Sequence, residues 1–162
     1  MACTHAKSQV PRTFRSVPFV ELKQFLPNQV AVISPFVDQL MRFIARFRSV
    51  DGSECGIELA LREALANAIV HGNQEDPHKR VYLVCRCTTD GEVSITIQDE
   101  GKGFNSGAVS DPTVPENRLL KHGRGIYVMK TLMDEVDFEQ GGAVVHMRKR
   151  SNADPGAMRN SQ

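Results

Sequence analysis

The hydrophobic residues of this chain change their spacing at Pro77, and that change limits the folds open to it. Before Pro77, apolar residues recur every three or four positions, as they do on helices. Beyond it, residues 81–87 and 93–97 alternate apolar and polar side chains, as strands with one buried face do. Asp90-Gly91 lies between the two runs and is a tight-turn signal, so the runs are predicted to pair as an antiparallel hairpin. The chain therefore combines helices with an antiparallel sheet.

Two helices are predicted ahead of the hairpin. The first is expected to start at Ser34-Pro35, an N-cap residue followed by proline at the first helical position. The second runs from Glu54 to about His71 and is rich in alanine and leucine until Gly72 ends it. The first helix has an apolar stripe that can face a core, formed by Phe36, Val37, Leu40, Met41, Ile44 and Phe47.

The remaining elements complete two layers. A short extended piece is predicted over residues 17–22, and a third helix from residue 125 to about 134 leads into a final hairpin over 135–139 and 143–148. Between residues 101 and 125, glycines and prolines interrupt any periodicity, which is typical of a functional lid or of a disordered loop. The predicted fold is α+β, a two-layer sandwich of a mostly antiparallel sheet with helices on one face.

Length and composition indicate one domain. The chain has 162 residues, of which 41% are hydrophobic, which is enough for one compact core. We expect that domain over residues 16–150, with flexible tails at 1–15 and 151–162. The 20 basic and 19 acidic residues nearly cancel, so no direct contact with nucleic acid is expected. No apolar stretch is long enough to span a membrane and the N-terminus lacks the apolar core of a signal peptide, so a cytoplasmic location is expected.

Three polar side chains on the second helix are candidates for a ligand site. Glu63, Asn67 and His71 follow one another at intervals of four, so they share one face of an α-helix. A solvated stripe would look similar, but Glu63 has no basic residue three or four positions away, whereas Glu58 and Arg62 form an ordinary surface pair. A carboxylate can accept a proton from a hydroxyl nucleophile, and an amide oxygen can bind magnesium. His71 is equally compatible with packing or capping at the helix end.

Two glycine-containing segments are further candidates. Residues 99–104 follow a strand directly; Asp99 could accept a hydrogen bond from an exocyclic amine such as that of adenine, although a plain turn is an equal alternative. Residues 123–126 open a helix, where backbone N–H groups can face a phosphate, although a simple loop-to-helix turn is again possible. The chain has neither the dinucleotide-binding glycine fingerprint nor a phosphate-binding P-loop. A nucleotide would therefore have to be bound by a different fold.

Taken together, these segments resemble the ATP-binding boxes of the GHKL superfamily. The resemblance rests on Glu63-Ala-Leu-Ala-Asn67 on a helix, Asp99-x-Gly101-x-Gly103 after a strand and Gly123-x-Gly125 before a helix. It covers about residues 15–150, and the stretch 63–73 looks especially like the bacterial anti-sigma-factor serine kinases. The resemblance implies the Bergerat-type sandwich shared by gyrase and histidine-kinase ATPase domains.

The resemblance also implies roles for single residues. Asn67 would ligate the Mg²⁺ bound to the phosphates of ATP, Asp99 would bind the adenine amino group, and Glu63 would be the general base of phosphoryl transfer. The residues it places around ATP are Asn67, His71, Asp99, Gly101, Gly103, Phe104, Gly123, Arg124, Gly125 and Ile126. ATP and Mg²⁺ are thus the cofactors to expect.

The implied activity is that of an ATP-dependent protein serine/threonine kinase. In the family, the kinase phosphorylates an anti-sigma-factor antagonist on Ser or Thr and, as a homodimer, sequesters a sigma factor. A non-catalytic ATP-binding regulatory module is an alternative. The detached catalytic domain of a histidine kinase is another, although the chain lacks the long helical hairpin with a phosphoacceptor histidine that such a kinase uses.

Overall fold

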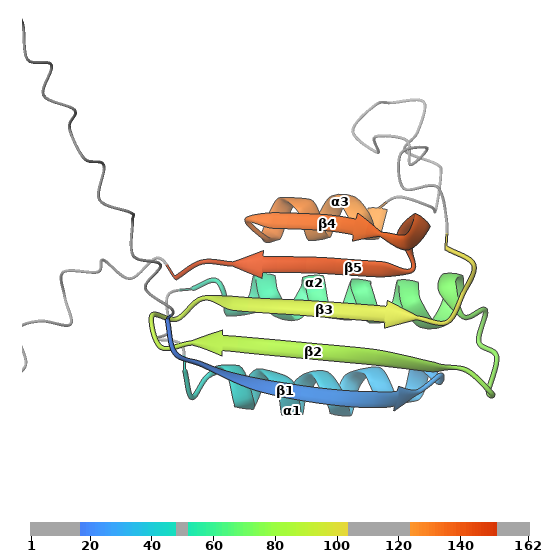
Figure 1. Cartoon of the computed structure of the whole chain (residues 1–162), viewed down its shortest axis with the longest axis horizontal. Coiled ribbons are helices and arrows are strands. Elements are labelled where there is room, and N and C mark those ends of the chain that lie inside the picture. The colour runs from blue at the N-terminus through green and yellow to red at the C-terminus, as the bar shows by residue number, and fades with distance from the viewer. Residues whose placement is uncertain (1–16, 48–51, 104–123, 152–162) are drawn as a thin grey trace, which may run out of the picture.

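The fold is a two-layer sandwich of one sheet and the helices that cover one of its faces (Figure 1). The computed structural model describes residues 17–47, 52–103 and 124–151. Their five strands are antiparallel and lie in the order β1-β2-β3-β5-β4. The strands are β1 (Phe19–Pro27), β2 (Arg80–Thr88), β3 (Val93–Asp99), β4 (Glu135–Glu139) and β5 (Val144–Lys149). The helices are α1 (Ile33–Ile44), α2 (Glu54–Ala66) and α3 (Arg124–Leu132). The α+β prediction is confirmed.

The core lies between the sheet and the helices, as the alternating pattern predicts. In β2 and β3, Leu83, Ile95 and Ile97 are almost fully buried against the helices. Leu83 pairs with Ile97 across the two strands, so the predicted hairpin has one continuous apolar face. Gly91 in its turn has a φ of +85°, which glycine adopts at no steric cost. The third helix and the final hairpin also lie where the sequence predicts them.

The N-terminal strand is longer than predicted. The extended piece expected over residues 17–22 is a nine-residue edge strand that continues to Pro27. Leu22 and Leu26 both turn toward the helices, but the polar Gln24 between them interrupts the apolar alternation. The pairing of Leu26 with Val81 carries the strand past that interruption.

The first helix begins differently from the prediction. A short 3-10 turn, η1 (Val30–Val32), runs directly into α1, so Ser34 is already inside the helix and caps nothing. Its hydroxyl instead accepts a hydrogen bond from Arg62 Nη1 at 3.1 Å. Pro35 falls in the first turn, where a missing N–H leaves no intrahelical bond unmade. The predicted N-cap is therefore wrong, whereas the predicted apolar stripe packs in the core.

The second helix changes its winding where the site begins. The sequence predicts one helix to about His71, but α2 ends at Ala66 and continues as the π-helical segment η2 (Asn67–Gly72). The N–H of Asn73 donates to the carbonyl of Ala68 at 2.8 Å, which closes the wider i→i+5 turn. Such π turns often lie at functional sites.

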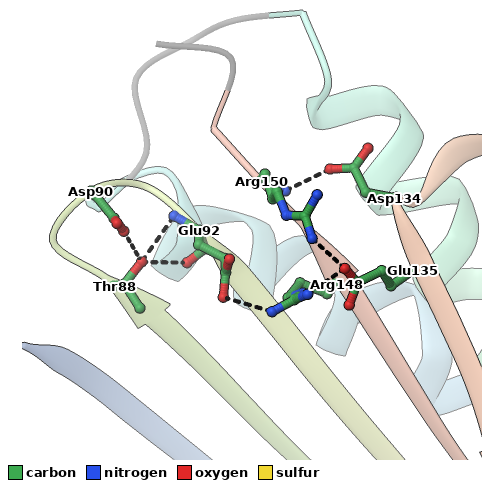
Figure 2. Close-up of polar contacts among 7 residues, drawn as sticks. All are labelled: Thr88, Asp90, Glu92, Asp134, Glu135, Arg148 and Arg150. Carbon is green, nitrogen blue, oxygen red and sulfur yellow. Dashed lines mark hydrogen bonds and ion pairs between the residues drawn. The ribbon is translucent and has the colours of Figure 1, made fainter. Parts of the chain in front are cut away.

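Ion pairs join the strands at the end of the sheet where β3 begins (Figure 2). Arg148 and Arg150 both contact the carboxylate of Glu135, and Arg148 also approaches Glu92 at 4.0 Å. The backbone N–H of Arg150 donates to Asp134 at 2.7 Å. Because Asp99 ends β3, this network lies at the opposite end of the sheet from Asp99. It joins β3, β4 and β5 without taking part in the predicted site.

Some expectations fall outside the described residues. Residues 104–123, which make up most of the predicted lid, lie outside the described residues. The predicted tails, 1–15 and 151–162, also lie outside them except for Ser151. Within those ranges, no helix combines the length and the apolar character needed to cross a membrane.

Candidate functional site

The site is built around the end of β3, where the backbone is packed very closely on both sides. A Cβ atom on Gly101 would lie 2.1 Å from the carbonyl oxygen of Gly72, at the end of η2. A Cβ atom on Gly103 would lie 2.4 Å from the carbonyl oxygen of Gly141, in the turn η5 (Gln140–Gly142) between β4 and β5. Gly103 also has a φ of +75°, which disfavours other residues. Glycine is therefore required at both positions.

Asp99 places a buried carboxylate at this point. Its side chain is only 7% exposed, and its Oδ1 accepts a hydrogen bond from the Gly101 N–H at 2.8 Å. Burial raises the pKa of the Asp99 carboxyl, although the Gly101 N–H and the positive charge of Lys79 act in the opposite direction. An ionised carboxylate has more acceptor sites than this one bond occupies, so it can still accept a hydrogen bond from a ligand.

Glu63 and Asn67 meet at the start of α3. A Cβ atom on Gly125 would lie 2.6 Å from Glu63 Oε2 and 3.3 Å from Asn67 Nδ2. Both side chains therefore point to the same glycine from α2 and η2, as their spacing of four predicts. A larger residue at position 125 would displace them.

A small cavity joins the two parts of the site. It is lined by Asn67 of η2 and Asp99 of β3, together with Ala64, Ala68, Met129 and Phe138. The small side chains of Ala64 and Ala68 leave this space beside the helix. The cavity holds about 20 Å³, room for about one water, so a purine could enter only if the lining moved apart.

The structure brings together most of the described candidates. Those that lie in or against the site are Glu63, Asn67, Asp99, Gly101, Gly103 and Gly125. His71 is exposed and does not line the cavity, Arg124 is exposed, and Ile126 is buried in the core. Phe104 and Gly123 lie outside the described residues. The predicted pair of Glu58 with Arg62 is present at 2.9 Å.

Sequence reasoning missed several residues that shape the site. Gly72 was predicted only to end a helix, yet a Cβ there would lie 2.3 Å from Asp99 Oδ2. Phe138 and Gly142 line the cavity from the final hairpin. The signal available for Gly72 was its position directly after the column of polar residues; hairpin residues gave no comparable signal.

Comparison with known proteins gives this geometry a family. Residues 26–149 match the model of the histidine kinase-like ATPase domain. The chain belongs to that family. Membership implies that it binds ATP, and the cavity between Asn67 and Asp99 lies within the matched region.

Anti-sigma F factors are among the proteins similar to this chain. The one from Heyndrickxia coagulans is 32% identical over 114 residues, which cover 66% of this chain and 76% of the relative. The one from Geobacillus thermodenitrificans is 32% identical over 127 residues, or 74% and 75% of the two chains. The one from Clostridium perfringens (strain SM101) is 32% identical over 115 residues, or 68% and 81%. This chain therefore belongs with ATP-dependent anti-sigma regulators.

The donor groups of the site are chemically suited to ATP and Mg²⁺. The described residues include no group of three or more His, Cys, Asp and Glu side chains that could hold a metal on its own. Mg²⁺ commonly takes one or two protein oxygens and completes its shell with phosphate oxygens and water. The Asn67 amide can supply one such oxygen beside the cavity, and Asp99 can accept from a purine amine.

Proposed function

We propose that this chain is an ATP-dependent anti-sigma regulatory factor that phosphorylates an anti-sigma-factor antagonist on Ser or Thr and sequesters a sigma factor. The observation that carries the proposal is the meeting of Glu63 and Asn67 at Gly125 while Asn67 and Asp99 line one cavity. Asn67 thus links the proposed base, Glu63, which it meets at Gly125, to the proposed purine acceptor, Asp99, with which it lines the cavity.

The nucleotide is held from two sides. Asp99 accepts a hydrogen bond from the adenine amine, and the glycines 101 and 103 let the backbone approach the ring closely. The amide oxygen of Asn67 binds Mg²⁺, which when present offsets the negative charge of the phosphates. Gly125, at the start of α3, places backbone N–H groups where a helix favours phosphate. Arg124, Gly123, Phe104, His71 and Ile126 belong to the same proposed binding set.

Glu63 serves as the base. Its carboxylate accepts the proton of the substrate Ser or Thr hydroxyl as the hydroxyl oxygen forms its bond to phosphorus and the bond to the leaving ADP oxygen breaks. Its position against Gly125, beside Asn67, lies where a phosphate at the α3 N-terminus would be reached. A binding module alone would have no use for a carboxylate there.

The proposed partners are proteins. The names of the relatives state that they oppose sigma F, and we extend a sigma-factor partner and an antagonist partner to this chain. We also propose a cytoplasmic homodimer. The edge strand β1 supports the dimer because Phe19 and Phe25 are each more than half exposed and, six residues apart in the strand, lie on the same face of it; exposed aromatic side chains favour association.

Incubation of the purified protein with labelled ATP and candidate antagonists tests the activity. The wild type is expected to label Ser or Thr of an antagonist. Glu63→Gln is expected to lower the transfer rate by roughly 10²- to 10⁴-fold, the usual worth of a general base, and to keep nucleotide binding. Glu58→Gln is the matched control, because Glu58 is a carboxylate on the same helix that pairs with Arg62.

Three results would contradict parts of the proposal. Unchanged transfer by Glu63→Gln would remove Glu63 as the base. Nucleotide binding by the wild type without transfer to any antagonist would identify a non-catalytic module. Label on histidine, which is lost in acid, would identify histidine-kinase chemistry.

A further inference from the structure

Asn73 has a fully buried side chain that joins three other segments of the chain. Its Oδ1 accepts the N–H of Glu100 at 2.8 Å, directly after Asp99. Its Nδ2 donates to the carbonyl of Arg80 at 2.9 Å, at the start of β2, and to Asn28 Oδ1 at 3.2 Å, just after β1. One amide thus connects the end of η2 to the ends of three strands.

The connection to Glu100 fixes the strand end that bears Asp99. Gly72 and Asn73 lie beside Asp99 and Glu100, and the Asn73 bond holds these two chain segments together. The spacing is already at its limit, because even a Cβ on Gly72 would overlap the Asp99 carboxylate. A small change in this spacing would therefore move the carboxylate.

The backbone of Asn73 fixes the helix side of the same site. Its N–H donates to Ala68 and closes the π turn that begins at Asn67. The main chain and the side chain of Asn73 therefore act on different parts of the site. The main chain holds the segment that carries Asn67, and the side chain holds the strand end that carries Asp99.

We propose that Asn73 is a positioning residue that sets the Asp99 carboxylate for recognition of the adenine amine. The proposal rests on the proposed ATP-binding function of this site. An amide suits the position because it provides one acceptor and two donors, and all three are used. Alanine would leave the Glu100 N–H and the Arg80 carbonyl without these bonds.

Selectivity between ATP and inosine triphosphate tests positioning separately from stability. Inosine triphosphate carries a carbonyl oxygen in place of the adenine amine, so it cannot make the hydrogen bond that the amine donates to Asp99. The dissociation constants of both nucleotides are measured by calorimetry on the full chain, at a temperature where each variant is folded. The wild type is expected to prefer ATP. Asn73→Ala is expected to lose about tenfold or more of that preference, as befits one hydrogen bond to a charged group, with little change for inosine triphosphate.

Two further variants separate positioning from folding. Asn73→Asp keeps an acceptor for the Glu100 N–H but loses donors, so it is expected to lower the melting temperature while retaining the preference for ATP. Asn28→Ala is the matched control: it removes a buried amide of the same network, which also donates to the Asp76 carbonyl at 2.9 Å, but leaves the Glu100 bond intact. Its preference is expected to stay within about threefold of wild type, less than one hydrogen bond is worth.

The outcomes distinguish this inference from the proposed function. Wild-type selectivity in a folded Asn73→Ala protein would overturn the positioning role and leave the function of the site intact. If the alanine variant does not fold, the same selectivity in Asn73→Ser decides, because serine is too short to span the same three partners. No preference for ATP in the wild type would overturn both the adenine role of Asp99 and the positioning role of Asn73.

Discussion

Gly72→Ala is the substitution that tests the proposed adenine site most directly, because it adds one methyl group next to Asp99. The new Cβ would lie 2.3 Å from Asp99 Oδ2, 2.4 Å from its Cγ and 2.6 Å from its Oδ1. Ordinary contact requires about 3.5 Å, so the carboxylate would have to retreat by about 1 Å. It has little freedom to do so, since Oδ1 is bonded to the Gly101 N–H and the side chain is buried. The backbone of Gly72 is not in the left-handed region, so the effect is steric.

The expected loss of ATP affinity follows from the hydrogen bond to the adenine amine that a displaced Asp99 carboxylate cannot make. A hydrogen bond to a charged group contributes about 1.5–3 kcal/mol, which corresponds to roughly 10- to 150-fold in affinity. We expect Gly72→Ala to weaken ATP binding by about that factor. Overpacking of a closely packed site also lowers the free energy of unfolding by about 1–3 kcal/mol.

The assay is calorimetric titration with ATP, with thermal melts to select a temperature at which the variant is folded. Gly56→Ala is the matched control on α2, since its new Cβ would lie 3.6 Å from Leu132, an ordinary contact. It is expected to bind ATP as the wild type does and to be as stable or slightly more stable, because alanine favours helix over glycine by about 1 kcal/mol. A folded Gly72→Ala protein with wild-type ATP affinity would refute the assignment of Asp99 to the purine.

Two more predictions follow from the same residues. Asn67→Ala is expected to weaken Mg²⁺-ATP binding by tenfold or more and adenosine binding very little, because the role proposed for this amide is to bind the metal rather than the purine; equal losses measured by calorimetry would contradict a metal role. ATP affinity is expected to fall on acidification at a pH above the ordinary aspartate pKa of 3.8, because the pKa of Asp99 is raised and the charged carboxylate is a stronger acceptor for the amine than the protonated acid. The stability contribution of Asp99 has the opposite sign: burying its charge costs stability above the folded pKa, and that cost is relieved as the pH falls through it. Titrations from pH 7 downward with Asp99→Asn as control check this, and an equal pH dependence in the variant would exclude Asp99 as its source.

Much of the fold could be predicted from the sequence because local patterns and tertiary packing agree. The alternation in residues 81–87 and 93–97 survives in the structure as the buried face of β2 and β3. The end of β1 could not be predicted, because Gln24 interrupts the pattern and only pairing with β2 extends the strand. The start of α1 was misplaced for a related reason, since η1 supplies helical backbone ahead of Ser34.

The polar groups of the candidate site could be predicted from the sequence, but the positions that exclude any side chain could not. Glu63, Asn67 and Asp99 carry recognisable chemistry, and their spacing survives in the fold. The exclusion of any side chain at Gly72 depends on how closely η2 approaches the end of β3, which is a tertiary distance. The role of the buried Asn73 amide could not be predicted from the sequence either, because the three groups that its side chain bonds lie 7, 27 and 45 residues away along the chain.

The change of winding at Asn67 bears on how one helix would serve both ends of a nucleotide in the proposed site. Glu63 lies on the α-helical part and reaches Gly125, whereas Gly72 lies at the end of the π-helical part and touches Asp99. A wider turn advances less along the axis per residue than an α turn does, so η2 shifts Gly72 relative to Glu63. Gly72 could not move closer to Asp99, because the two residues are already packed so closely that a Cβ on Gly72 would overlap the carboxylate. The π segment thus lies between Glu63, the proposed base, and Gly72, which packs beside the proposed purine acceptor Asp99, and the hydrogen bond from the Asn73 N–H to the Ala68 carbonyl closes this segment.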